Sequence, residues 1–194
     1  MTSILVVCTG NICRSPMAEG LLRVALDRRL GERAPSVSSA GTMGLGGYAA
    51  SPEGVEAARE LGADIEGHVA RRLSTPMAEE ADLLLCMASE HREIVASASP
   101  ALAARAFTLK ELVRLLETLP ESQGDPLEVR LSAADAARRA GAVPPSQDDD
   151  IADPLGQPLA AYRAIAWELE TWIERAILGL YGSATSAEAA VGEA

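Results

Sequence analysis

Aromatic side chains are scarce in this sequence: only 3% of its 194 residues are Phe, Trp or Tyr. Proteins that bind single-stranded nucleic acid use aromatic rings as stacking platforms, so that class of function is disfavoured. Basic side chains are also few, because 17 Lys and Arg residues face 28 Asp and Glu residues, for a formal net charge of −11. A protein with such an excess of negative charge repels polyanions such as nucleic acids. We therefore expect no nucleic-acid partner.

Cysteine and histidine are also rare in the sequence, and long apolar runs are absent from it. The three cysteines, Cys8, Cys13 and Cys86, lack the spacing of a paired disulfide framework or of a four-ligand zinc site. The two histidines, His68 and His91, have no carboxylate partner at metal-ligand spacing. No stretch approaches the ~18 apolar residues of a membrane span, and the N-terminus does not resemble a signal peptide. We expect a cytoplasmic monomer without membrane insertion, metal or cofactor.

The remaining composition is that of a folded domain. Hydrophobic residues make up 48% and charged residues 23% of the chain, close to the averages for globular proteins. At roughly 150 residues per domain, the length predicts a single domain over residues 1–181. The last residues, 182–194, have the composition of a disordered tail.

Apolar runs alternate with helical patterns along the chain. We expect strands at 4–7, 37–40, 83–87 and 105–109, and helices at about 15–30, 52–61, after 89, 110–117 and 159–181. Strands that alternate with helices form parallel sheets. The predicted fold class is therefore α/β, with a four-stranded parallel sheet flanked by helices.

Residues 118–150 interrupt this alternation. The segment contains four prolines, two glycines and the acidic run Asp148-Asp149-Asp150. A structureless loop of that length is unusual inside a compact domain. We interpret the segment as a flexible insertion, within which 132–140 could form a short helix.

The most informative segment is Cys8-Thr-Gly-Asn-Ile-Cys-Arg14-Ser15, between the first strand and the first helix. Gly10 and Asn11 tolerate left-handed backbone angles, and Ser15 offers a capping hydroxyl before Pro16. In a parallel α/β sheet, ligands bind at this edge. The backbone N–H groups of such a loop and of the helix N-terminus can converge on one phosphate group. We therefore predict a phosphate-binding loop here.

Two side chains add chemistry to that loop. Arg14 can hold two phosphate oxygens with its guanidinium, and the positive field favours the thiolate form of Cys8, a nucleophile. The alternative is that Cys8 is a small buried residue and Arg14 a solvated charge. The strand before the loop and the helix after it favour the catalytic interpretation.

The run Val7-Cys-Thr-Gly-Asn-Ile-Cys-Arg-Ser-Pro16 resembles the V-C-x-G-N-x-C-R-S-P signature of the low-molecular-weight protein tyrosine phosphatases. Further similarities are Ser39-Ala-Gly41, His68-Val-Ala-Arg71, Asp82-Leu-Leu-Leu-Cys-Met87 and Asp153-Pro154. The resemblance spans about residues 1–117 and 151–181. It does not include the segment 118–150.

The resemblance implies hydrolysis of a phosphorylated protein substrate in two steps. Cys8 would attack phosphorus, Arg14 would stabilise the transition state, and Asp153 would protonate the leaving oxygen. The phosphate-binding residues would be Thr9, Gly10, Asn11, Ile12, Cys13 and Arg14, and Ser15, Ser39 and His68 would hold Asn11 in place. Independently of the family, an Asp-Pro turn before a long helix can hold a carboxyl over the site, although many such residues only cap turns.

Cys13 has two interpretations. By resemblance it would trap oxidised Cys8 as a reversible disulfide; alternatively it is a small buried side chain. Cys86, inside an apolar strand, is expected in the core.

Several functions remain open on the same scaffold. Protein arginine phosphatases have a similar Phe107-Thr-Leu-Lys-Glu111 stretch and Asp153-Pro-Leu-Gly156 turn, but they carry threonine where this chain has Ile12. An arsenate reductase would need two further cysteines near Cys86, and a non-catalytic phosphate-binding module would lack the nucleophile or the acid. Leu45 and Leu155 occupy the expected cleft walls, where many family members have aromatic residues, so stacking on a phosphotyrosine ring would be weaker.

Overall fold

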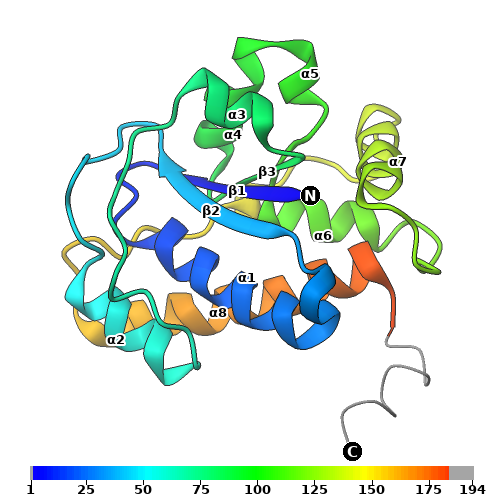
Figure 1. Ribbon diagram of the computed structural model, residues 1–194. Helices are drawn as coiled ribbons and strands as arrows, with labels where there is room; N and C mark the ends of the chain where they lie inside the picture. The colour runs from blue at the N-terminus through cyan, green and yellow to red at the C-terminus, as the bar shows by residue number, and fades with distance from the viewer. Residues whose placement is uncertain (1, 184–194) are drawn as a thin grey trace, which may run out of the picture.

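The computed structural model describes residues 2–183 (Figure 1). The strands are β1 (Ser3–Cys8), β2 (Ser36–Gly41), β3 (Leu83–Cys86) and β4 (Ala106–Thr108). The α-helices are α1 (Arg14–Leu30), α2 (Pro52–Glu60), α3 (Thr75–Glu80), α4 (Ser89–Ala98), α5 (Pro100–Ala103), α6 (Leu109–Leu116), α7 (Leu127–Arg139) and α8 (Leu159–Tyr181). Short 3-10 helices occupy Gly31–Arg33 and Gln147–Asp149.

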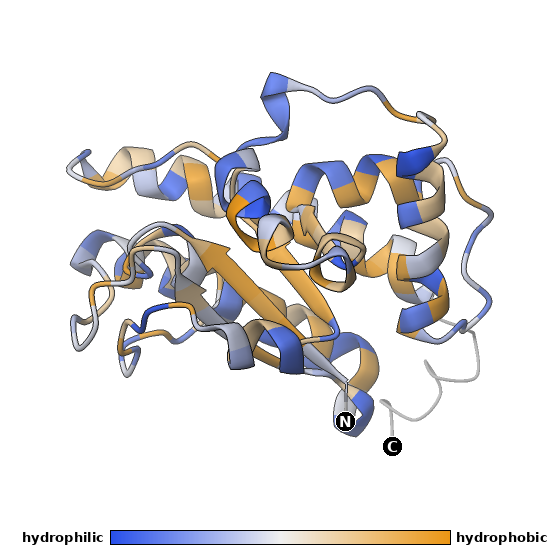
Figure 2. Cartoon of the chain, turned by 90° about the horizontal axis from the view of Figure 1, so that it is seen from above, coloured by the Kyte–Doolittle hydropathy of each residue, from blue (hydrophilic) through white to orange (hydrophobic). Residues whose placement is uncertain are grey.

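The strands form one sheet in the order β2-β1-β3-β4, and all three pairings are parallel. Val6 lies opposite Ser39 on one side and Leu85 on the other, and Leu85 lies opposite Phe107. The predicted fold class is thus confirmed. Figure 2 shows the strands as a hydrophobic layer between helices, which is why β1 and β3 are continuous apolar runs rather than alternating ones.

Successive residues of β1 supply the two faces of the sheet. Ile4 and Val6 belong to the larger buried cluster, which also contains side chains of α1, α6, α7 and α8. Leu5 and Val7 belong to a smaller cluster with side chains of α3, α4 and α5. Both faces are therefore covered by helices, as a parallel sheet requires.

The segment 118–150 differs from its prediction. Instead of a short helix at 132–140 within a flexible excursion, α7 spans Leu127–Arg139, and Leu127, Leu131 and Ala134 are buried in the larger cluster. These three side chains recur at helical spacing, so 127–139 packs against the domain. The guanidinium of Arg130 donates hydrogen bonds to Gly179 O of α8 and to Pro120 O.

Two short helices, α3 and α5, were not expected from the sequence. The helix α8 has the predicted bounds and is followed by Gly182, whose φ of 75° suits glycine. Most of the predicted tail, residues 184–194, lies outside the described residues.

Candidate active site

The loop between β1 and α1 has its carbonyl groups turned outward. Backbone N–H groups of neighbouring segments hold them: Thr42 N to Cys8 O (2.9 Å), Met43 N to Thr9 O (2.9 Å), Leu45 N to Gly10 O (3.0 Å) and Ser51 N to Ile12 O (2.8 Å). In a trans peptide the C=O and the following N–H point in opposite directions. The N–H groups of residues 9, 10, 11 and 13 are therefore directed into the loop, where they can surround an anion.

Asn11 holds the turn of this loop. Its φ is 57°, and it is the only non-glycine residue between 2 and 183 with a positive φ; Gly10, expected to share this role, does not have one. The Asn11 Nδ2 group donates to Ser15 Oγ at 2.9 Å and to Ser39 Oγ at 2.8 Å. Its Oδ1 atom accepts a hydrogen bond from Arg71 N at 2.9 Å. Every polar position of the amide is thus used.

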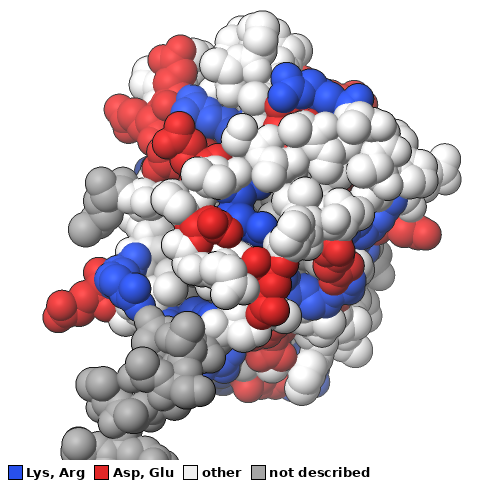
Figure 3. Space-filling view, turned by 90° about the vertical axis from the view of Figure 1, so that its right-hand side faces the viewer, with Lys and Arg blue, Asp and Glu red and all other residues white. Residues whose placement is uncertain are grey.

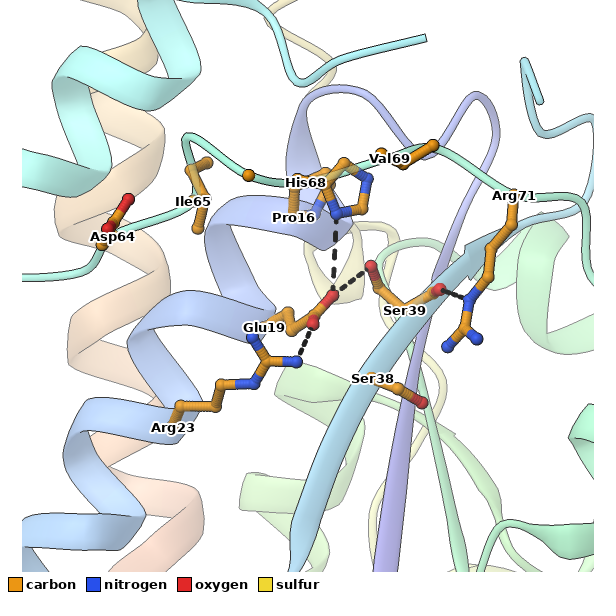
Figure 4. A pocket seen from close by; sticks show the side chains of 11 residues that line it. Pro16, Glu19, Arg23, Ser38, Ser39, Asp64, Ile65, His68, Val69 and Arg71 are labelled. Carbon is orange, nitrogen blue, oxygen red and sulfur yellow. Dashed lines mark hydrogen bonds and ion pairs between the residues drawn. The ribbon is translucent and has the colours of Figure 1, made fainter. Parts of the chain in front are cut away.

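A second layer of side chains, in which His68, Ser39 and Glu19 lie close together (Figure 4), supports Asn11. His68 Nε2 lies 2.8 Å from Asn11 O and must donate to it, since a carbonyl only accepts. Ser39 Oγ donates to Glu19 Oε2 at 2.5 Å, and Glu19 also pairs with Arg23. The layer borders a hollow of about 590 Å³ that is lined by none of the loop residues 8–13. The structure thus brings Ser15, Ser39 and His68 to Asn11, whereas the role of Glu19 was missed by the sequence analysis.

The Cys8 sulfur lies at the base of the loop, 2.9 Å from Ser15 Oγ and 3.3 Å from Asn11 N. Because Ser15 Oγ accepts a hydrogen bond from Asn11, its own proton is free to point at the sulfur, so two donors can stabilise a thiolate. The expectation that Ser15 caps α1 is wrong: the helix begins at Arg14 and has no side-chain cap. The Ser15 hydroxyl is used inside the loop instead.

Arg14 and Asp153 form an ion pair beside the loop. Arg14 Nη2 lies 2.6 Å from Asp153 Oδ2 and 3.2 Å from Thr9 Oγ1, and Nη1 donates to Ile151 O at 3.2 Å. The buried Nε atom of Arg14 has no partner among residues 2–183, so it remains available to an anion. The Asp153 side chain is 44% exposed, and its Oδ1 atom accepts from Leu155 N at 3.1 Å.

These groups border a cavity of about 200 Å³. It is lined by Cys8, Thr9, Gly10, Ile12, Cys13, Arg14, Met43, Leu45, Asp153 and Leu155. Both expected wall residues, Leu45 and Leu155, are present there. Met43 was not expected, because its place in a glycine-rich loop after β2 carries no pattern that assigns it to a site.

The cysteines differ in surroundings. Burial raises the pKa of the Cys13 thiol, whose sulfur lies 3.5 Å from Tyr162 Oη. Cys86 is fully buried in β3, and burial raises its pKa strongly, as expected for a core residue. All three cysteines are free thiols. A redox role for Cys13 stays a prediction.

Residues 2–183 contain neither a cluster of metal ligands nor a membrane-spanning helix. No group of three or more His, Cys, Asp or Glu side chains is placed to hold a metal ion. No helix in this part of the chain is both long enough and apolar enough to cross a membrane.

Comparison with known proteins assigns the family. The family model of the low molecular weight phosphotyrosine protein phosphatases matches residues 3–129. The chain belongs to this family. The predicted enzyme class, a cysteine-dependent phosphatase, is thereby confirmed.

Individual relatives include two kinds of phosphatase. A probable low molecular weight protein-tyrosine-phosphatase, EpsP of Ralstonia nicotianae, is 43% identical over 110 residues, which cover 57% of this chain and 72% of EpsP. The protein-arginine-phosphatase of Bacillus subtilis is 41% identical over 110 residues, covering 57% of this chain and 71% of that protein. The crystal structure of the low molecular weight protein tyrosine phosphatase from T. tengcongensis superposes with a TM-score of 0.68 at 34% identity, covering 91% of this chain and 98% of the other.

Proposed function

We propose that this phosphatase hydrolyses phosphotyrosine in proteins through a cysteinyl-phosphate intermediate. The observation that carries the proposal is the convergence of three groups on one small cavity. Cys8, the loop that follows it and the Arg14–Asp153 ion pair all line this cavity. Each group has a distinct role in phosphoryl transfer.

In the first step the substrate phosphoryl group enters the loop and replaces Asp153 as the partner of Arg14. The Cys8 thiolate attacks phosphorus, and the bond from phosphorus to the tyrosine oxygen breaks. Protonated Asp153 donates its proton to that oxygen, so that a neutral phenol leaves. The Arg14 guanidinium and the loop N–H groups stabilise the charge on the equatorial oxygens.

In the second step water attacks the same phosphorus atom. The Asp153 carboxylate takes a proton from this water, the P–S bond breaks, and Cys8 returns to the thiolate form. Inorganic phosphate leaves, and Asp153 is again protonated for the next cycle. No further reactant is required.

The test is turnover of p-nitrophenyl phosphate and of a phosphotyrosine peptide by the parent and by Cys8→Ser. Serine is not ionised at neutral pH, so we expect turnover to be lost while phosphate still binds. Phosphate binding, measured by calorimetry, controls for an intact loop. Activity of Cys8→Ser within about tenfold of the parent, far less than the loss caused by removal of a nucleophile, would contradict the assignment.

Phosphoarginine is the second candidate substrate. It is favoured by the Asp153-Pro-Leu-Gly156 turn, which resembles that of arginine phosphatases, and by the aliphatic wall residue Leu155. Against it stands Ile12, whose side chain lines the cavity. A guanidinium N–H buried against methyl groups without a hydrogen-bond partner costs roughly 1–3 kcal/mol of binding free energy. An aromatic ring has no N–H group and does not incur this cost.

We therefore expect the parent to prefer a phosphotyrosine peptide over the matched phosphoarginine peptide. Ile12→Thr should shift the kcat/KM ratio toward phosphoarginine by about ten- to a hundredfold, the equivalent of that penalty. Ile12→Val, which changes size but not polarity, is the control. Faster hydrolysis of phosphoarginine by the parent would reverse the assignment of substrate.

A further inference from the structure

His91, on α4, contacts the phosphate-binding loop through Thr9. It lies in the first turn of α4, its side chain is 1% exposed, and its Nε2 atom is 2.9 Å from Thr9 Oγ1. Thr9 in turn lines the cavity of the site. The buried imidazole therefore reaches the site through one hydroxyl group.

The surroundings of the ring fix which nitrogen carries the proton. Glu90 Oε1 lies 3.3 Å from His91 Nε2, and a carboxylate can only accept. The Nδ1 atom is buried and has no partner among the described residues. A proton on Nε2 faces two acceptors, whereas a proton on Nδ1 would be a buried donor without a partner, which is costly.

The same ring is uncharged at neutral pH. Burial, followed by the positive charge of Arg14, lowers the pKa of His91 to about 4, despite the opposing carboxylates of Asp150 and Asp153. A neutral ring has a single N–H. That N–H is the one on Nε2, and it points toward Thr9.

Thr9 Oγ1 consequently accepts two hydrogen bonds. One comes from His91 Nε2 and the other from Arg14 Nη2 at 3.2 Å. A hydroxyl oxygen has two lone pairs and one proton. With both lone pairs occupied, the oxygen has only its own proton left to offer, and the open space beside it is the cavity.

We propose that His91 is a positioning residue that turns the Thr9 hydroxyl into a hydrogen-bond donor to the phosphoryl group. The Thr9 O–H then adds a side-chain donor to the loop N–H groups and the Arg14 guanidinium. No proton is transferred, and His91 does not touch the substrate. The inference rests on the proposed function, because the hydroxyl acts on a phosphoryl group bound in the loop.

A double-mutant cycle tests this coupling. Thr9→Val keeps the shape of the side chain and removes the hydroxyl, and His91→Leu removes the N–H that orients it. Loss of a hydrogen bond to a charged group weakens binding by a factor of about ten to a hundred. We therefore expect each single variant to lower kcat/KM for p-nitrophenyl phosphate by that factor. In the Thr9→Val background, adding His91→Leu should lower kcat/KM by less than about threefold.

Conservative variants separate positioning from packing. His91→Gln carries an amide N–H near the place of Nε2 and should recover most of the loss seen with His91→Leu. Thr9→Ser keeps a hydroxyl and should lose less than Thr9→Val. Vanadate inhibition gives a second readout, since the inhibition constant should rise by the same factor as kcat/KM falls.

Each outcome decides the matter. Equal losses from His91→Leu in the parent and in the Thr9→Val background would mean that His91 acts only through packing of α4, and the inference fails. If His91→Leu does not fold, an equal loss from Thr9→Val and Thr9→Ser overturns it in the same way. A parent that does not hydrolyse p-nitrophenyl phosphate would instead contradict the proposed function.

Discussion

At the scale of single residues, Asn11 shows why the loop needs one residue type. Its backbone lies in the left-handed region, which glycine adopts at less cost. Glycine, however, has no side chain to bond Ser15, Ser39 and the backbone of Arg71 as Asn11 does. Asparagine combines tolerance of a positive φ with three hydrogen-bonding positions, so the strained turn is held by its own side chain.

Asp153 is the carboxylate expected to act as general acid. Asp153→Asn should lower kcat by about 10²–10⁴-fold, the usual scale for this role. The loss should be largest for a phosphotyrosine peptide and smaller for p-nitrophenyl phosphate, whose leaving group departs with little protonation. Steady-state kinetics with both substrates measures the difference.

Asp150→Asn is the matched control. The Asp150 carboxylate accepts from Ser89 N at 2.7 Å and from Ser89 Oγ at 3.2 Å, so it is already used at the start of α4. Its loss should cost less activity than that of Asp153. A larger loss in Asp150→Asn would mean that the acid is misassigned.

His91 makes stability depend on pH. Its pKa of about 4 lies below the ordinary value of 6.5, so between these values the unfolded chain binds a proton that the folded protein does not. Stability is therefore lost as the pH falls from 6.5 to about 4, by about 3 kcal/mol at most. Urea unfolding at pH 7 and pH 4.5 should show a smaller loss in His91→Gln than in the parent; identical losses would exclude His91 as the cause.

At the scale of elements, α7 tests whether 118–150 is part of the fold. Leu131 is 4% exposed within the larger cluster, whereas Val129 on the same helix is 53% exposed. Leu131→Ala should lower the free energy of unfolding by about 2–5 kcal/mol, because it leaves a cavity. Val129→Ala should change it by no more than about 0.5 kcal/mol. Equal, small effects in urea unfolding would mean that α7 does not pack on the domain.

The elements that the sequence analysis found and missed differ in length. The 17-residue α1 and the 23-residue α8 contain several turns, so their apolar periodicity is visible. The helices α3 and α5 have 6 and 4 residues. Such short helices carry no measurable period and form because neighbouring elements pack against them.

At the scale of the whole molecule, the net charge of −11 acts on every charged substrate. On the face shown in Figure 3, acidic side chains lie beside basic ones without a continuous basic patch. The acidic excess should favour phosphopeptides flanked by Lys or Arg over matched peptides flanked by Glu. We expect a kcat/KM ratio on the order of tenfold at low salt.

Salt provides the control for that preference. Screening shortens the range of these interactions, with a Debye length of about 8 Å at physiological ionic strength, so the ratio should fall as salt is added. A ratio that does not change with ionic strength would assign the preference to local contacts at the cavity instead of the overall charge.

The local part of the site was readable from the sequence. The apolar run of β1, the loop with Asn11, the nucleophile Cys8 and Arg14 all lie within fourteen residues of the N-terminus. The residue types of this unit are recognisable locally, although distant segments such as residues 42–45 also hold the loop carbonyls in the folded protein. The order of strands and helices also follows from apolar periodicity, which is a local signal.

The family resemblance assigned Asp153, Ser39 and His68 to the site, but only the tertiary structure decided which atoms of distant side chains meet there and which further residues join them. Arg14 meets Asp153 across 139 positions, and Thr9 meets His91 across 82. Glu19 is recruited because β2 carries Ser39 beside β1. A parallel sheet brings the carboxyl ends of separate strands to one edge, and the contacts made there depend on strand order and helix packing, which a local pattern of residues does not contain.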